Sequence, residues 1–265
     1  MGDFITHEFV LWNMSSSQAI QANALTKQYG STTAVESLDL SIPPGTVYGF
    51  LGPNGAGKTT TIRMLVTLLK PSSGTASIAG HPITERDQVT PKLGYLPETP
   101  PLYDELTGRE QLEYIAGLRD MSDEHAAERI DELLDLFDLA GDANKRISTY
   151  SKGMKQKTGI IQAILHDPPV VFLDEPTSGL DPRAARTVRN TIADLTAGDT
   201  TVFLSTHILP VVDELADTVG VLFDGDLVAE GPPEQLKQQA ETGEKRTLED
   251  VFLEVTSEDE LVQEV

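Results

Sequence analysis

The segment from Gly52 to Thr60 combines residue types that bind phosphate. Its sequence, Gly52-Pro53-Asn54-Gly55-Ala56-Gly57-Lys58-Thr59-Thr60, fits the pattern G-x-x-x-x-G-K-[ST]. Glycines let the backbone curve tightly, so that consecutive N–H groups point at phosphate oxygens. The Lys58 ammonium can reach the β- and γ-phosphates of a nucleotide, and the Thr59 hydroxyl can ligate Mg²⁺. The segment therefore predicts a site for a nucleoside triphosphate.

Two consecutive carboxylates follow an apolar segment later in the chain. Residues 170–173 (VVFL) have the pattern of a buried strand, and Asp174 and Glu175 come directly after it. Ligands of open α/β sheets bind at this end of the strands. We expect Asp174 to hold Mg²⁺ through water, and Glu175 to orient and polarise an attacking water as a general base. A carboxylate pair that merely caps the next turn is the alternative, which the phosphate loop makes the weaker one.

A phosphate loop needs a strand before it and a helix after it. Residues 47–51 (VYGFL) have the composition of a buried strand. Residues 60–69 carry apolar side chains at helical spacing, and Pro71 marks the expected end of that helix. Strand, loop and helix in this order are the setting that the motif requires.

Strand and helix patterns alternate along the rest of the chain. We expect further strands at 20–22, 38–42, 75–79, 170–173, 201–204 and 219–223, the last leading through an Asp224-Gly225 turn into a hairpin strand. We expect helices within 107–140 and at 151–165, 182–195, 232–239 and 247–255. This alternation predicts an α/β fold with a mainly parallel sheet. Residues 1–16 match no element, and Met14 is an alternative start to Met1.

The composition limits the functional classes. The chain has 265 residues, 39% of them hydrophobic, which suffices for a substantial core. It has no cysteine, which fits a reducing cytosol, and no apolar run long enough to cross a bilayer. The formal net charge is −22, with 42 acidic and 20 basic residues. This excess argues against nonspecific nucleic-acid binding. We interpret it as adaptation to molar salt in a halophile, with an ordinary acidic protein as the alternative.

The motifs and their order resemble the ATP-binding cassette (ABC) family over about residues 19 to 235. The phosphate loop, Asp174-Glu175, Ser178-Gly179-Leu180-Asp181 and Ser205-Thr206-His207 carry the resemblance. It implies a P-loop NTPase core with a mainly parallel sheet, an antiparallel β subdomain and a helical subdomain. It also implies a head-to-tail dimer with two ATP molecules at the interface.

The resemblance also implies how the chain is divided. We expect an N-terminal extension over 1–16, a nucleotide-binding core over 17–98 and 160–235, and a helical subdomain with the signature motif over 99–159. An acidic, helical C-terminal tail would occupy 236–265.

Site residues follow from the motif positions. The residues expected to bind ATP are Tyr29, Gly52, Asn54, Gly55, Ala56, Gly57, Lys58, Thr59, Thr60, Ser151, Gly153 and Asp181. Tyr29 occupies the position at which the family stacks an aromatic ring on adenine, although it is also an ordinary strand-end tyrosine. Ser151 and Gly153, in Tyr-Ser-Lys-Gly-Met, would face the ATP of the partner subunit from a helix N-terminus. Asp181 would lie across the dimer interface, and His207 would contact the γ-phosphate and Glu175.

Several positions depart from the family pattern, since only Ser151 and Gly153 match the usual signature, and two departures change the charge of the site. Glu98 stands where the family usually has glutamine, and we expect it to act in catalysis and at the Mg²⁺ site with Thr59 and Asp174. It can accept a hydrogen bond from a metal-bound water, or it can weaken the site by repulsion. Lys152 replaces a glycine of the signature and adds a positive charge.

These observations together predict the ATP-hydrolysing subunit of an ABC transporter, of the export (drug or multidrug efflux) type. Its partners would be an integral membrane permease and a second ATPase subunit, as a homodimer or a heterodimer, and not nucleic acid. It would be cytoplasmic, at the inner face of the membrane, and the permease would choose the substrate. The alternative is a soluble ABC-type ATPase that acts on DNA or the ribosome, which the single cassette and the lack of a basic patch disfavour.

Overall fold

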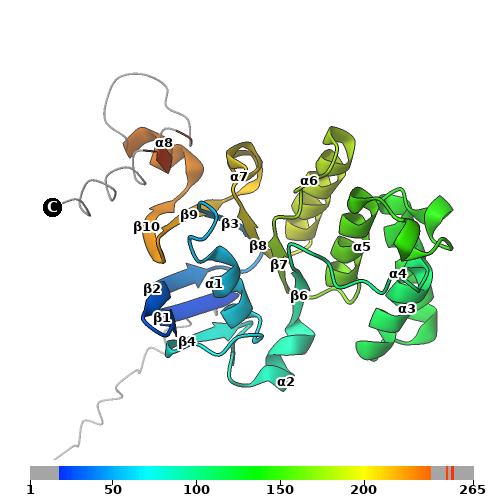
Figure 1. Cartoon of the computed structure of the whole chain (residues 1–265), viewed down its shortest axis with the longest axis horizontal. Coiled ribbons are helices and arrows are strands. Elements are labelled where there is room, and N and C mark those ends of the chain that lie inside the picture. Colours follow the sequence, from blue (N-terminus) through cyan, green and yellow to red (C-terminus); the bar gives the residue numbers. More distant parts are fainter. Residues whose placement is uncertain (1–17, 240–248, 250–251, 254–265) are drawn as a thin grey trace, which may run out of the picture.

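The described part of the chain contains two β-sheets, of which the larger runs through the middle of the molecule (Figure 1). The computed structural model describes residues 18–239, 249 and 252–253. An antiparallel sheet has the order β2-β1-β4-β5 and contains β1 (Ile20–Tyr29), β2 (Thr32–Ile42), β4 (Ser73–Ile78) and β5 (His81–Pro82). The second sheet has the order β10-β9-β3-β8-β7-β6 and contains β3 (Val47–Leu51), β6 (Leu93–Leu96), β7 (Val170–Asp174), β8 (Thr201–Thr206), β9 (Thr218–Phe223) and β10 (Asp226–Gly231). Only the β9–β10 hairpin is antiparallel in this second sheet, which confirms the predicted fold class.

Eight α-helices surround the sheets in the part of the chain that the structure describes. They are α1 (Lys58–Leu65), α2 (Arg86–Val89), α3 (Gly108–Leu118), α4 (Asp123–Leu136), α5 (Lys152–Ile164), α6 (Pro182–Ala197), α7 (Leu209–Leu215) and α8 (Pro233–Gln239). Short 3₁₀ turns occur at Thr90–Lys92, Ala140–Asp142 and Ile147–Thr149. In Figure 1, α3 and α4 lie at the opposite end of the molecule from the antiparallel sheet. None of the helices within the described ranges is long and apolar enough to cross a membrane.

The central strands alternate their side chains between two apolar layers. In β7, Val170 and Phe172 belong to one buried cluster, whereas Val171 and Leu173 belong to another. Successive side chains of a strand point to opposite faces, so a strand covered on both faces is apolar throughout. Both faces of this sheet are therefore covered, and its polar residues are left to the strand ends.

The first layer holds α1 between the two sheets. Ile62, Met64 and Leu65 of α1 pack in one cluster with the inner face of the antiparallel sheet and with aromatic rings of the central sheet. The Phe203 ring lies 5.1 to 5.4 Å from the rings of Tyr48, Phe50 and Phe172, measured between centroids. These distances are typical of favourable aromatic pairs. The packing holds the strands that carry the site in a fixed relation.

The second layer joins the opposite face of the central sheet to α3, α4, α5 and α6. The helices α3 and α4 begin with caps that their sequences encode. Thr107 Oγ1 accepts from Glu110 N–H (3.2 Å) while Glu110 Oε2 accepts from Thr107 N–H (2.8 Å), which forms a capping box. The Ser122 hydroxyl accepts from the His125 N–H (3.4 Å) at the start of α4.

Some predicted boundaries differ from the structure. The helix after the phosphate loop ends at Leu65 and not at Leu69, because Thr67 adopts φ +63 and the N–H groups of residues 68–69 donate back to Arg63 O at 2.9 Å. The predicted domain boundary between residues 159 and 160 falls inside the continuous helix α5. The division into subdomains stays a prediction, and residues 1–16 lie outside the described residues. Of the predicted helix over 247–255, the structure describes residues 249 and 252–253, which are helical.

A partly buried histidine generates a prediction for stability. His166 follows α5, and its Nε2 lies 3.1 Å from Leu93 O. Burial and the neighbouring Arg119 guanidinium lower the pKa of His166 from 6.5 to about 4. The unfolded chain then binds a proton as the pH falls below about 6.5, whereas the folded chain does not until about pH 4. Acidification from pH 7 to pH 4 therefore lowers the free energy of unfolding through His166, by at most about 3 kcal/mol.

We expect the variant His166→Gln, which keeps a donor for Leu93 O, to remove this contribution. The difference between the unfolding free energies of the variant and the native protein should grow in favour of the variant between pH 7 and pH 4. Urea unfolding at a series of pH values and constant salt measures it. Two curves that stay parallel over this range would show that His166 carries no such linkage.

Candidate functional site

The phosphate loop connects the carboxyl end of β3 to α1. Residues 52–57 form the turn, and the Thr61 N–H donates to Gly57 O at 2.9 Å where the helix begins. Gly55 and Gly57 adopt φ +89 and +107. Residues with a Cβ rarely adopt such values, so the loop needs glycine at both positions.

The same loop is packed closely against the protein behind it. A Cβ on Gly57 would lie 2.3 Å from Ala34 O of β2, and a Cβ on Gly52 would lie 2.4 Å from Leu222 O of β9. The Gly225 N–H also donates to Ala56 O (3.1 Å) from the β9–β10 turn. The curve of the loop is therefore fixed from behind by two strands of different sheets.

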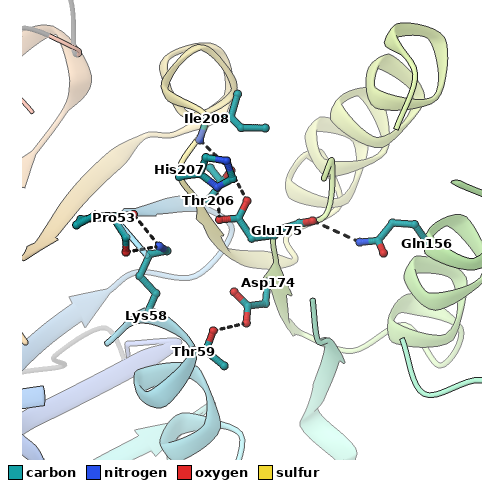
Figure 2. A network of polar contacts seen from close by, with 10 residues as sticks. Pro53, Lys58, Thr59, Gln156, Asp174, Glu175, Thr206, His207 and Ile208 are labelled. Atoms are coloured by element: carbon teal, nitrogen blue, oxygen red, sulfur yellow. Dashed lines mark hydrogen bonds and ion pairs between the residues drawn. The ribbon is translucent and has the colours of Figure 1, made fainter. Parts of the chain in front are cut away.

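The Lys58 ammonium lies inside this curve (Figure 2). It donates to the carbonyl oxygens of residues 52–53 at 2.6 and 3.0 Å, and its side chain is buried. Burial lowers the pKa of Lys58, whereas the charges of Glu175, Asp174 and Glu98 act in the opposite direction. A cation held at this place is suited to bind the terminal phosphates of a nucleotide.

Asp174, the last residue of β7, faces the start of α1. The Thr59 hydroxyl donates to Asp174 Oδ2 at 2.9 Å (Figure 2). Burial raises the pKa of Asp174, the hydrogen bond from Thr59 opposes this, and the charges of Glu175 and Glu98 add to it. Two oxygen ligands thus lie together beside the phosphate loop, which is the donor set that Mg²⁺ prefers.

Glu175 follows Asp174 in the chain, and its carboxylate contacts two residues at the end of β8. The Thr206 hydroxyl donates to Glu175 Oε2 at 3.0 Å, and His207 Nδ1 lies 2.8 Å from Glu175 Oε1 (Figure 2). Glu175 itself is 7% exposed and adopts φ +52. For a residue with a Cβ this backbone conformation costs about 1–2 kcal/mol. Strain of this kind is frequent at functional sites, where the surroundings hold the residue in place.

These side chains line one pocket of about 460 Å³. Its lining residues are Ala34, Pro53, Asn54, Gly55, Gly57, Lys58, Thr59, Thr60, Glu98, Asp174, Glu175, Ser178 and His207. Gly52 and Ala56 belong to the loop but are not among these lining residues. The sequence motifs are thus brought together from β3, β6, β7 and β8. The role of Glu98 stays a prediction, although its charge already adds to the repulsion at Asp174.

Besides Gly52 and Ala56, four further predicted site residues lie outside the described lining of this pocket. The Ser151 hydroxyl caps α5 by accepting from the Met154 N–H (3.2 Å), and Gly153 follows in its first turn. Asp181 caps α6 and accepts from the N–H groups of residues 183–184 at 2.9 Å, which lowers its pKa. Ser151 and Asp181 are both exposed at these helix N-termini.

Tyr29 ends β1, and its side chain is 51% exposed. Lys27 Nζ lies 5.2 Å from the centre of its ring, within the range of a cation–π contact. The ring therefore offers an exposed aromatic surface, and its contact with adenine stays a prediction.

The sequence interpretation assigned no role to Thr206 or Gln156. In the sequence, Thr206 is notable only as the residue before His207. A serine or threonine at the end of a strand does not by itself indicate that its hydroxyl binds a carboxylate. The helical pattern does single out Gln156. It shares a helix face with Ile160 and Ala163, where an apolar residue is expected. A buried glutamine on such a face indicates a specific hydrogen-bond partner.

Comparison with known proteins agrees with this geometry. The family model described as "ABC transporter" matches residues 35–178. A daunorubicin resistance ATP-binding protein from Streptomyces coeruleorubidus is 42% identical over 229 residues, which cover 86% of this chain and 72% of that protein. A bacitracin transport ATP-binding protein from Bacillus licheniformis is 40% identical, over 84% of this chain and 72% of that protein.

Solved structures agree as well. The ATP-binding subunit of an ABC transporter superposes with a TM-score of 0.84 at 31% identity, over 90% of this chain and 99% of that chain. A bacterial ABC transporter cassette, solved as a dimer, gives a TM-score of 0.75 at 26% identity, over 80% of this chain and 98% of that chain. The chain therefore belongs to the ABC transporter family, as an ATP-binding and ATP-hydrolysing subunit similar to the daunorubicin resistance and bacitracin transport ATP-binding proteins.

Proposed function

We propose that this subunit hydrolyses ATP with Glu175 as the general base and uses the energy to drive a separate membrane permease. The observation that carries the proposal is the Glu175 carboxylate, held by Thr206 and His207 beside the phosphate loop. Because both oxygens of this carboxylate have partners, its orientation is fixed before a water molecule arrives. Relatives named for drug resistance and antibiotic transport favour export, and not the soluble alternative that acts on DNA or the ribosome.

The ionisable residues of the pocket and the phosphate loop have proposed tasks. Lys58 and the N–H groups of residues 54–59 would bind the β- and γ-phosphates. Thr59 and Asp174 would hold Mg²⁺, with Glu98 accepting from its water shell, and this ion would neutralise charge on the phosphate oxygens. Glu175 would accept the proton of the attacking water, and His207 would keep Glu175 in place and contact the γ-phosphate.

We further propose that two copies of the chain close around two ATP molecules. One chain carries both halves of such a site: the phosphate pocket, and the helix N-termini at Ser151 and Asp181 that lie outside its lining. A helix N-terminus attracts anions, so the γ-phosphate bound by one subunit would stabilise contact with the other. ATP would then favour the closed dimer, and hydrolysis would reopen it.

A groove beside the central sheet supports the proposal that the subunit binds a permease. It has a volume of about 270 Å³ and is lined mainly by apolar side chains from β6, α3 and the segment after α1, among them Leu68, Tyr95, Ile115 and Leu118. Leu68 and Leu118 are 56% and 63% exposed. We propose that a segment of the permease docks here and places the subunit at the cytoplasmic face of the membrane.

The phosphate-loop assignment predicts the effect of Lys58→Ala. Loss of a charge-assisted contact to phosphate should weaken ATP binding by about two orders of magnitude. Isothermal titration calorimetry measures the affinity. Lys92→Ala, which removes an exposed lysine, serves as the control and should keep the native affinity. Equal affinity in both variants would remove Lys58 from the binding site.

The general-base assignment predicts the effect of Glu175→Gln. The amide keeps the shape of the side chain but accepts no proton, so the turnover rate should fall about 10²- to 10⁴-fold while ATP binding persists. Light scattering in the presence of ATP should then show a stable dimer. Glu128→Gln, at an exposed position of α4, is the matched control. A monomer with bound ATP would contradict the closure mechanism.

The groove assignment predicts that Leu118→Glu separates the subunit from its permease. A carboxylate in an apolar interface would be desolvated without a partner. Co-purification of the permease with the tagged subunit should fall at least tenfold, with the thermal unfolding midpoint unchanged because Leu118 is exposed. Leu136→Glu changes an exposed leucine (48%) of α4 that is not among the groove residues, and should keep the permease. Equal recovery with both variants would place the docking surface elsewhere.

A further inference from the structure

Gln156 connects helix α5 to the backbone of the proposed base. Its side chain is 2% exposed, and its Nε2 donates to the carbonyl oxygen of Glu175 at 3.4 Å (Figure 2). The same Nε2 also donates to the carbonyl oxygen of Pro176 at 3.3 Å. Both partners are pure acceptors, so the amide must present its nitrogen to them. The contact is therefore specific for a donor at this position of α5.

The contact meets the backbone where it is strained. Glu175 adopts φ +52, and its N–H donates to Ser205 O at 2.9 Å. Its carbonyl oxygen accepts from Gln156 and from the Ser178 N–H (3.1 Å), which closes the turn that follows. These bonds act on both sides of the strained residue, and the backbone conformation fixes the direction in which the carboxylate points.

The first turn of α5 contacts the end of the same loop. A Cβ on Gly179 would lie 2.8 Å from Lys152 Nζ, and a Cβ on Gly153 would lie 3.5 Å from Leu180 Cδ2. Gly179 has φ +73, so it supplies both the conformation and the space that the lysine needs. The helix thus touches the loop over 175–180 at its beginning and at its end.

We propose that Gln156 is a positioning residue for the hydrolytic reaction, which it serves by holding Glu175 in its left-handed conformation. It also makes α5 and the loop over 175–180 move as one unit, so a shift of the Ser151 end of the helix displaces the carboxylate. The inference rests on the proposed role of Glu175 as the base. It assigns to Gln156 no contact with ATP.

The variant Gln156→Leu tests this inference because it keeps the approximate volume and removes the donor. We expect kcat to fall at least tenfold while the KM for ATP changes less than about twofold. Gln156→His returns an N–H at a similar reach and should recover part of the lost kcat. It also provides a second test should the leucine variant fold poorly, which urea unfolding reveals.

Gln162→Leu is the matched control. Gln162 lies on the same helix, is 8% exposed, and accepts from Gln111 Nε2 at 2.9 Å, away from Glu175. We expect it to lose stability comparably and to keep kcat within twofold. If both variants lower kcat equally, or if Gln156→Leu keeps the native kcat, Gln156 has no positioning role.

Glu175→Gln, measured in parallel, separates this inference from the function on which it rests. An inactive Glu175→Gln together with a fully active Gln156→Leu would overturn the role of Gln156 alone. A Glu175→Gln variant with native turnover would overturn the general-base assignment, and the role of Gln156 with it. An inactive Glu175→Gln and a Gln156→Leu variant impaired in kcat only would support both.

Discussion

The arrangement depends on the electrostatic balance between the Lys58 ammonium and the carboxylates of Asp174 and Glu175. Burial lowers the pKa of the lysine and raises that of Asp174, so each ion is costly in this place by itself. Together they compensate each other, provided that the scaffold holds them at a fixed separation. The scaffold does so because β3, which leads to the lysine, and β7, which ends in the carboxylates, are parallel strands with β8 between them.

The apolar layers keep those strand ends in register. Phe203 of β8 packs against aromatic rings from β3 and β7, the same strands that carry the charged groups at their ends. A shift of one strand by one residue would turn its apolar side chains to the wrong face. The same strands therefore set both the core packing and the site geometry. Because their apolar side chains fix the register of the strands, they also fix where the charged residues at the strand ends lie. The antiparallel sheet adds the wall behind the phosphate loop.

Local patterns sufficed for the features that depend on neighbouring residues. The phosphate loop, the strand before it and the Asp174-Glu175 pair combine short-range sequence with a fixed local geometry, and their strands were predicted closely. The contacts of Thr206 and Gln156 with Glu175 could not be predicted, because they join residues 31 and 19 positions apart through the tertiary fold. The end of α1 was predicted wrongly, because its apolar periodicity continues to Leu69 although the backbone turns at Thr67. Partner contacts of Ser151 and Asp181 depend on a second chain.

The glycines of the phosphate loop differ in how much space a larger side chain would find at each position. Around Gly55, no atom lies within 4 Å of an added Cβ, so only its positive φ of +89 disfavours replacement. At Gly52 and Gly57 a Cβ would lie only 2.4 and 2.3 Å from a backbone oxygen of β9 and β2, respectively, which cannot give way as the end of a flexible side chain can. Any larger residue at either position would have to displace β2 or β9 together with the loop. Such a substitution would therefore disturb one of the two sheets as well as the nucleotide site.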